Sequence, residues 1–204
     1  MDLKIESMEP HSFNGFSKFE FKEITKHRKL LIGDVLPQNK SLSYSAIITE
    51  LFIEKNGKEY NISDFKRFFD ICGFEPNWKN LQKARTELNL IEGKKKLSSQ
   101  ITSRLEKSTA SSPSLYIRCR PDSASVLVWK VLLERYFAGE DLLNVLPHRF
   151  GEFELTDESN TWYLRMADDD PFLFLAGPKA LTAELAAACP LHVMPVSGSM
   201  IYVL

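Results

Sequence analysis

The chain has 204 residues, of which 44 % are hydrophobic and 26 % are charged, and its formal net charge at pH 7 is −1. This composition is typical of a globular protein that buries a core, and it excludes a largely disordered chain. The first residues, MDLKIESMEP, lack the basic and apolar regions of a secretory signal. The most apolar stretch with a helical pattern, Val126–Leu133, is interrupted by Lys130 and is far shorter than the roughly 20 residues that span a bilayer. We therefore expect a cytoplasmic protein that makes no use of a membrane.

The three cysteines, Cys72, Cys119 and Cys189, lie far apart, and none forms a C-x-x-C pair. An odd number at such spacings argues against both a disulfide framework and a zinc site. Reduced thiols are the expectation.

Charge is distributed unevenly along the chain. Residues 1–110 hold 19 basic and 15 acidic residues, a net of +4, whereas residues 111–204 hold 7 and 12, a net of −5. This shift favours two modules over one domain with polar faces. We predict a helical domain over 1–107, a linker over 108–113 and a second domain over 114–204.

In the first half, Lys18–Lys22 alternates charged and aromatic residues like a strand, and residues 37–41 indicate a loop. Apolar residues then recur at helical spacing in three stretches, near 44–52, 65–72 and 78–88. Ser63 and Asn77 are the predicted N-caps of the second and third helices, and Gly73 is the predicted C-terminal glycine of the second. Asn56-Gly57 is interpreted as the end of the first helix.

The second half is predicted to combine strands and helices. Residues 115–119 read as a strand and residues 123–137 as a helix capped by Ser123. Residues 153–155 and 162–166 flank a polar turn and predict a hairpin. A strand over 172–176, a helix over 179–188 and a second hairpin from 192–196 and 200–204 complete an α+β arrangement with an antiparallel sheet.

The stretch Ile62–Ile91 resembles the winged helix-turn-helix superfamily. The pieces that carry the resemblance are Ile71-Cys72-Gly73, a short turn over 74–77, the helix 78–89, and Leu90-Ile91 before Glu92-Gly93-Lys94. The similarity covers residues 43–96, about a quarter of the chain; Pro76 in the turn departs from the common pattern, and the strands of the wing are not clear. The resemblance implies a helical DNA-binding domain. Beyond the residues that it covers, residues 101–105 are predicted to form either a wing strand or a short helix.

If Trp78, Leu81, Ala84 and Leu88 face the core, other side chains of this helix face solvent. The outward set, with the lysines of the expected wing, gives the predicted DNA contacts: Lys79, Gln82, Lys83, Thr86, Lys94, Lys95 and Lys96. Arg85 falls at the edge of the buried stripe, where its stem would pack and its head would reach water. Residues 77–107 hold 8 basic and 3 acidic residues, the positive charge that phosphate neutralisation needs. The aromatic stripe Phe65, Phe68 and Phe69 is more simply explained as core than as a base-stacking platform.

Motifs for nucleotide cofactors and for a serine nucleophile elbow are missing, and the four histidines lie far apart. No cofactor and no metal are therefore predicted. Asp168-Asp169-Asp170, with Glu152 and Glu154, could hold Mg²⁺ in a nuclease, but a solvated loop is the preferred interpretation. Arg118 and Arg120 could pair with these carboxylates or bind an anion.

The sequence thus favours a protein that is not an enzyme and that binds double-stranded DNA, either a transcriptional regulator or an accessory factor in a DNA transaction. A homodimer is expected, since two such helices would read adjacent half-sites. Residues 114–204 would dimerise, sense a ligand or recruit a protein partner. The alternative is a protein-interaction module such as an adaptor, an assembly factor or an immunity protein resembling an antitoxin; acidic side chains that interrupt the basic face would favour it.

Overall fold

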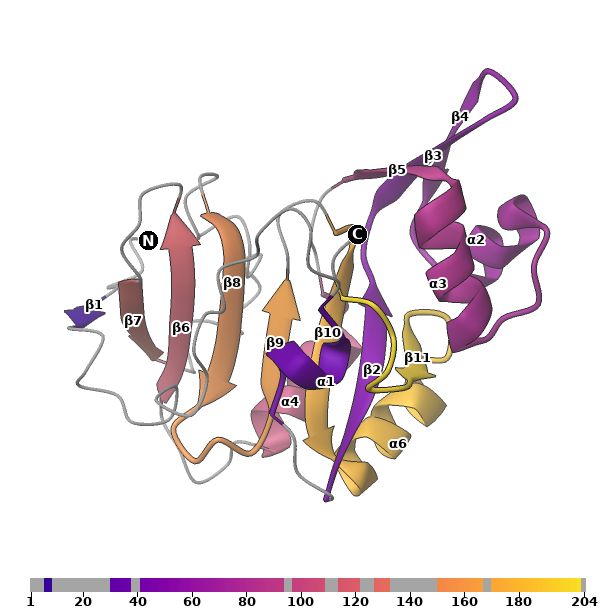
Figure 1. The fold of residues 1–204 in the computed structure, drawn as a ribbon. Coiled ribbons are helices and arrows are strands. Elements are labelled where there is room, and N and C mark those ends of the chain that lie inside the picture. Colours follow the sequence, from indigo (N-terminus) through magenta and orange to yellow (C-terminus); the bar gives the residue numbers. More distant parts are fainter. Residues whose placement is uncertain are drawn as a thin grey trace.

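The computed structural model describes residues 6–8, 30–37, 41–93, 97–108, 114–121, 127–132, 150–166 and 170–202. These residues form helices and two antiparallel sheets, which confirms the predicted α+β class (Figure 1). No helix among them is long and apolar enough to cross a membrane.

The larger sheet has eight strands, and each is antiparallel to its neighbours. A strand from before the predicted linker, β2, lies between β10 and β11, which come from after it. In spatial order the strands are β1 (Glu6–Met8), β7 (Leu127–Leu132), β6 (Ser114–Pro121), β8 (Phe150–Asp157), β9 (Tyr163–Met166), β10 (Phe172–Pro178), β2 (Leu42–Ile48) and β11 (Val193–Val196).

The smaller sheet has three strands and is formed within residues 51–93. Its order is β4 (Lys58–Ile62), β3 (Leu51–Lys55) and β5 (Asn89–Glu92). The helices α2 (Phe65–Cys72) and α3 (Trp78–Glu87) lie between β4 and β5 in the chain and beside this sheet in space (Figure 1).

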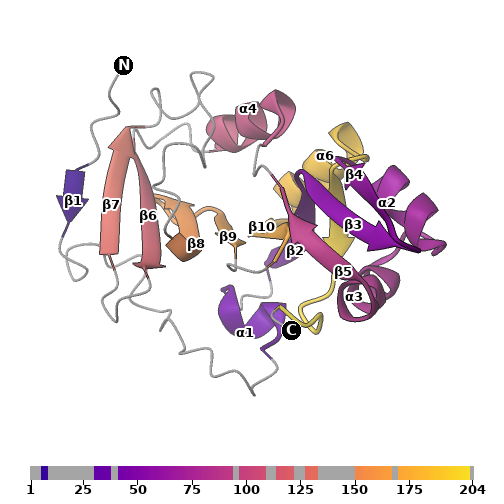
Figure 2. The same ribbon diagram turned by 90° about the horizontal axis from the view of Figure 1, so that it is seen from above.

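Helices cover both faces of the larger sheet (Figure 2). On one side lie α4 (Ser99–Ser108) and α6 (Lys179–Ala188), and on the other lies the short α1 (Ile32–Val35) beside the C-terminal end of the chain. Successive side chains of β10 point to opposite faces of the sheet, so they pack into two separate parts of the core. Phe172 and Phe174 join the core shared with α1, α2 and α3, whereas Leu173 and Leu175 join the core beneath α4 and α6.

The helix predicted over 44–52 is wrong, because these residues form β2 and the start of β3. A central strand buries apolar side chains on both faces, so its sequence lacks simple alternation and imitates helical spacing. Ala46 and Ile48 pack into one core and Ile47 into the other. Asn56-Gly57 likewise does not end a helix; with φ of 55° and 69° it forms the two-residue turn of the β3–β4 hairpin.

Two further predictions in the second half are wrong. Residues 127–132 of the predicted helix 123–137 form β7, which pairs with β6 and β1; the other residues of that helix lie outside the described residues. Residues 200–202 do not pair with β11 as a hairpin. They run beside residues 30–33, where Ile32 N–H donates to the Met200 carbonyl at 2.8 Å and Tyr202 N–H to the Leu30 carbonyl at 2.8 Å.

Other predicted elements are confirmed. These are the helices α2, α3 and α6, the strands β6 and β10, and the β8–β9 hairpin around the polar turn. Residues 101–105 belong to the helix α4 and not to a wing strand. The strand predicted over 18–22 and residues 109–113 of the predicted linker lie outside the described residues, while Ser108 ends α4.

Candidate nucleic-acid interface

In the unit formed by α2, the turn and α3, capping residues determine where the helices begin and where α2 ends. Asp64, one residue after the predicted Ser63, is the N-cap of α2, and its carboxylate accepts a hydrogen bond from Arg67 N–H at 2.8 Å. Gly73 ends α2 with φ 78°, a left-handed conformation that glycine adopts without strain. Asn77 then caps α3 by accepting from Asn80 N–H at 2.9 Å. Predictions for Gly73 and Asn77 are confirmed.

Three of the predicted DNA-contacting side chains lie exposed on α3. They are Lys79, Lys83 and Thr86. Each lysine also lies near an aromatic ring: the Lys79 ammonium is 5.8 Å from the centroid of Trp78, and the Lys83 ammonium is 4.7 Å from that of Phe74. Such contacts orient long side chains while leaving the charge in water.

Gln82 lies at the edge of this surface and is half-buried. Its side-chain oxygen accepts a hydrogen bond from Ile201 N–H at 3.3 Å. This oxygen is therefore occupied by the chain itself, whereas Lys79 and Lys83 extend into solvent.

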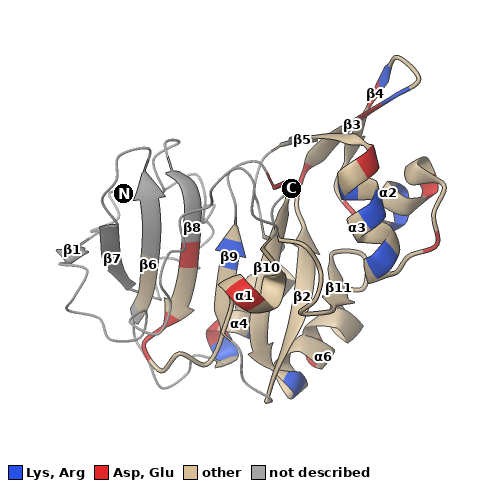
Figure 3. Ribbon diagram, viewed as in Figure 1, with Lys and Arg blue, Asp and Glu red and all other residues tan. Residues whose placement is uncertain are grey.

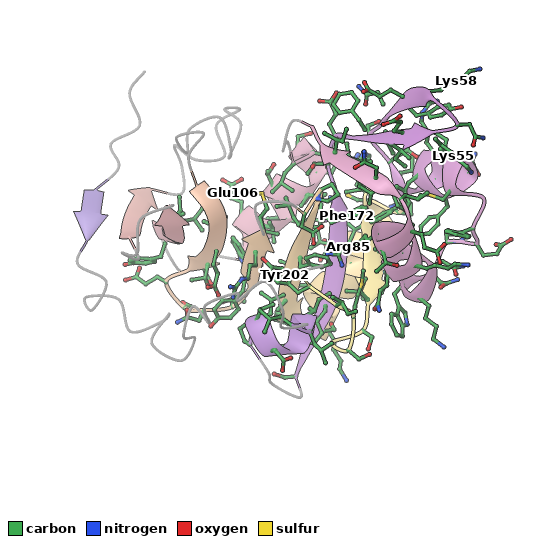
Figure 4. All side chains as sticks on the ribbon, turned by 45° about the horizontal axis from the view of Figure 1, so that its top comes forward. Lys55, Lys58, Arg85, Glu106, Phe172 and Tyr202 are labelled. Atoms are coloured by element: carbon green, nitrogen blue, oxygen red, sulfur yellow. The ribbon has the colours of Figure 1, made fainter. Side chains whose placement is uncertain are left out.

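Arg85 is not the surface residue that the sequence predicts. Its side chain is 2 % exposed and lies beneath α3, near Phe172 and Tyr202 (Figure 4). The guanidinium donates to the carboxylate of Asp170 and to the carbonyl oxygens of Ile201 and Tyr202. It also lies over the ring of Phe174, 5.2 Å from the centroid. These bonds, made by the two terminal nitrogens of the guanidinium, connect α3 to the residues just before β10 and to the C-terminal segment 201–202.

Asp170 is correspondingly not part of a solvated loop. It is 4 % exposed, and besides the ion pair its Oδ1 accepts from Phe172 N–H at 3.0 Å. Asp168, Asp169 and the side chains of Glu152, Arg118 and Arg120 lie outside the described residues. Glu154 is buried on β8, in register with Arg165 of β9. Among the described residues, no group of three or more His, Cys, Asp or Glu side chains is arranged to hold a metal ion.

The charge of the α3 surface is positive towards the start of the helix and mixed towards its end (Figure 3). Lys83 lies 3.9 Å from Glu87, one turn further on, and both side chains are about half exposed. Glu87 therefore interrupts the basic line that begins at Lys79. Lys94, Lys95 and Lys96, which were predicted to extend it, lie outside the described residues.

The hairpin of this unit precedes α2 in the chain, where the sequence interpretation placed a helix. β3 and β4 project beyond the helices, and Lys58 lies near the outer end (Figure 4). Lys55 turns back, and its ammonium donates to the carbonyl oxygens of Ile71 at 2.5 Å and Cys72 at 3.4 Å, at the C-terminus of α2. Asn-Gly between two short alternating stretches is the signal that would have located this hairpin.

Two buried groups on the shared core have raised pKa values. Burial raises the pKa of the Cys72 thiol from 9.0 to about 11, and the nearby Lys55 opposes this shift. Burial, followed by the charges of Glu154 and Asp157, raises the pKa of the Tyr163 hydroxyl to about 12. Both groups are therefore neutral at physiological pH, and neither is an activated nucleophile.

Comparisons of the chain with family models, with curated proteins and with solved structures found no match.

Proposed function

We propose that this protein is a non-catalytic DNA-binding protein that places α3 against double-stranded DNA, as a transcriptional regulator or an accessory factor in a DNA transaction. The observation that carries the proposal is the α2–turn–α3 unit, in which Lys79, Lys83 and Thr86 extend from α3 while its opposite side is fixed to the core.

The dimensions of α3 suit this role. The helix has 10 residues and is about 15 Å long. Its diameter with side chains, about 10–12 Å, fits the major groove of DNA, which is about 12 Å wide. Lys79 and Lys83 would contact phosphates, which fix the position of the helix, and Thr86 could reach a base edge. Because Glu87 lies at the end of the helix, we place the two lysines, which lie in the first two turns of α3, closest to the phosphates.

The test is binding of the purified chain to a labelled random-sequence duplex, measured by fluorescence anisotropy over a salt series. Affinity should fall as salt rises, because bound phosphates release counterions. The Lys79→Ala/Lys83→Ala variant should bind more weakly at every salt concentration. It should also reduce the slope of log K against log salt by about 2, one for each lost phosphate contact.

A matched control is Lys107→Ala/Lys179→Ala, which removes the same charge from exposed positions on α4 and α6. Its binding should stay close to that of the parent chain. Equal weakening by the two double variants would show that net charge alone drives binding, and the absence of binding at low salt would reject the DNA proposal. A homodimer, which we also propose, would show as two half-sites about 34–36 Å apart in a footprint.

A second candidate function, a protein-interaction module, is favoured by the Lys83–Glu87 ion pair. An acidic side chain within the basic line lowers its attraction for phosphate, whereas mixed charges are common at the rims of protein interfaces. Failure of DNA binding together with a stable complex of defined composition would support this alternative.

A further inference from the structure

The smaller sheet has two unlike faces. Alternate side chains of its strands, among them Leu51, Ile53 and Ile62, point towards α2 and α3 and are fully buried in the shared core. The intervening residues form the other face, which we call the outer face: Phe52 and Glu54 on β3, Glu59 and Asn61 on β4, and Asn89 and Ile91 on β5.

The outer face exposes apolar surface at one end. Ile91 is 44 % exposed, and Leu191 is the other large hydrophobic side chain of the described residues with comparable exposure. Ile91 is the direct cross-strand neighbour of Phe52, which is half-buried and belongs to neither core. Ile91 and Phe52 are thus adjacent apolar side chains on the face of the smaller sheet that points away from α2 and α3.

The next row of the outer face is acidic. Glu54 of β3 is directly opposite Glu59 of β4, and its neighbour on β5 is the neutral Asn89. Both glutamates are exposed. Like charges directly opposite one another destabilise a strand pair, since opposed Cβ atoms lie only about 4.5–5.5 Å apart. The repulsion would be relieved by a cation placed between the two carboxylates.

We propose that the outer face docks a protein segment that carries basic side chains next to an apolar one. The apolar residue contacts Phe52 and Ile91, and a lysine or arginine lies between Glu54 and Glu59. Charge complementarity selects this occupant, because nucleic acid would be repelled by the same two carboxylates. This surface is on the opposite side of the smaller sheet from α3, so it is independent of the proposed DNA contact.

The segment lies across the face rather than extending the sheet at β4. The free edge of β4 is already used in part, because Arg67 Nε donates to the carbonyl oxygen of Asn61 at 3.1 Å. At the margin of the face, Asn61 Nδ2 donates to Glu50 Oε1 at 2.8 Å, which holds a further carboxylate beside it.

The experiment is a titration of the isotope-labelled full chain with a short synthetic peptide of alternating lysine and valine, followed by amide chemical shifts in NMR spectra. The shifts should concentrate in β3, β4 and β5. A peptide of alternating glutamate and valine should cause none. Glu54→Gln/Glu59→Gln should weaken binding of the basic peptide about fivefold, as expected for the loss of exposed ion pairs, and Ile91→Ser should weaken it independently of salt.

A matched control is Glu75→Gln/Glu87→Gln, which removes the same charge from exposed positions on the helical side. Its affinity for the basic peptide should stay close to that of the parent chain. The proposal is overturned if both double variants weaken binding equally, if shifts spread over other acidic surfaces, or if the peptide does not bind. It is also overturned if sedimentation shows self-association that Glu54→Gln/Glu59→Gln abolishes, since a second copy would then be the occupant.

Discussion

The smaller sheet and its two helices are built from neighbours in the chain, whereas the larger sheet joins strands from distant segments. Residues 51–93 supply a hairpin, two helices and a returning strand in unbroken succession. In the larger sheet, β2 pairs with β10 and β11, more than 100 residues away, and β1 pairs with β7. Local turns and caps can direct the first region, while the second depends on long-range burial.

The two regions nevertheless share one core. Phe65 and Phe68 of α2 lie against Phe172 of β10, with ring centroids 6.0 Å and 5.5 Å apart. Arg85 and Asp170 form a buried ion pair across the same junction. The two regions therefore differ in whether nearby or distant residues determine their structure. Because they share one core, we expect them to unfold together.

The largest expected effect comes from breaking that junction. Arg85→Ala should lower the free energy of unfolding by about 3–5 kcal/mol, because it leaves the carboxylate of Asp170 and two carbonyl oxygens buried without their donor. Denaturant unfolding followed by circular dichroism measures this loss.

The control is a double-mutant cycle with Asp170→Asn, which retains an acceptor for Phe172 N–H. The double variant should lose less stability than the sum of the two single variants. A loss near 0.5 kcal/mol for Arg85→Ala, as at a surface site, would contradict the buried ion pair.

The same contrast explains which elements the sequence predicts. Gly73 and Asn77 form their capping hydrogen bonds with residues nearby in the chain. The end of α2 and the start of α3 can therefore be predicted from the local sequence. The helix predicted over β2 is wrong because both faces of this strand are buried in cores that include residues far away in the chain. The β3–β4 hairpin is a different case, because Asn56-Gly57 is a local signal that fits both a helix end and a two-residue turn, and the structure shows the turn.

The candidate site divides in the same way. Leu81 and Ala84 face the core as helical periodicity predicts, and Lys79, Lys83 and Thr86 are exposed. Arg85 is the exception, because the acid that holds it lies 85 residues further along the chain. Sequence spacing placed it at the edge of the buried stripe but carried no information about that partner.

An intermediate effect is expected at alkaline pH. The folded protein keeps the Cys72 thiol neutral to about pH 11, whereas the thiol of the unfolded chain ionises near 9.0. The unfolded chain therefore releases its proton at a lower pH than the folded protein. The contribution of this thiol to the free energy of unfolding is fully present below pH 9 and is lost as the pH rises towards 11. Tyr163, on the larger sheet, adds a loss between its ordinary value of 10.0 and about 12.

Cys72→Ala should remove the earlier part of this decline and leave the later part. The measurement is the free energy of unfolding from denaturant curves at several pH values between 8 and 11, with the parent chain as reference. Parallel curves for the two proteins over this range would contradict the buried, neutral thiol.

The smallest expected effect tests whether the two regions unfold together. Gly57 and Gly73 have φ of 69° and 78°, and nothing lies within 4 Å of a Cβ added at either. Alanine at either position thus introduces backbone strain without a steric clash, at a cost of about 1–2 kcal/mol. Gly57→Asn and Gly73→Asn should cost less, because asparagine tolerates this conformation.

Amide hydrogen exchange measures which parts of the protein lose stability in Gly57→Ala. Because Ile53 and Ile62 of the smaller sheet pack into the same core as Phe172 and Phe174, we expect the most protected amides of β10 and β2 to exchange faster by the same factor as those of α2. Faster exchange confined to residues 51–93 would mean that this region opens alone. The shared core would then be a contact between two units that unfold separately. The stability of residues 51–93, like their structure, would depend mainly on contacts among these residues themselves.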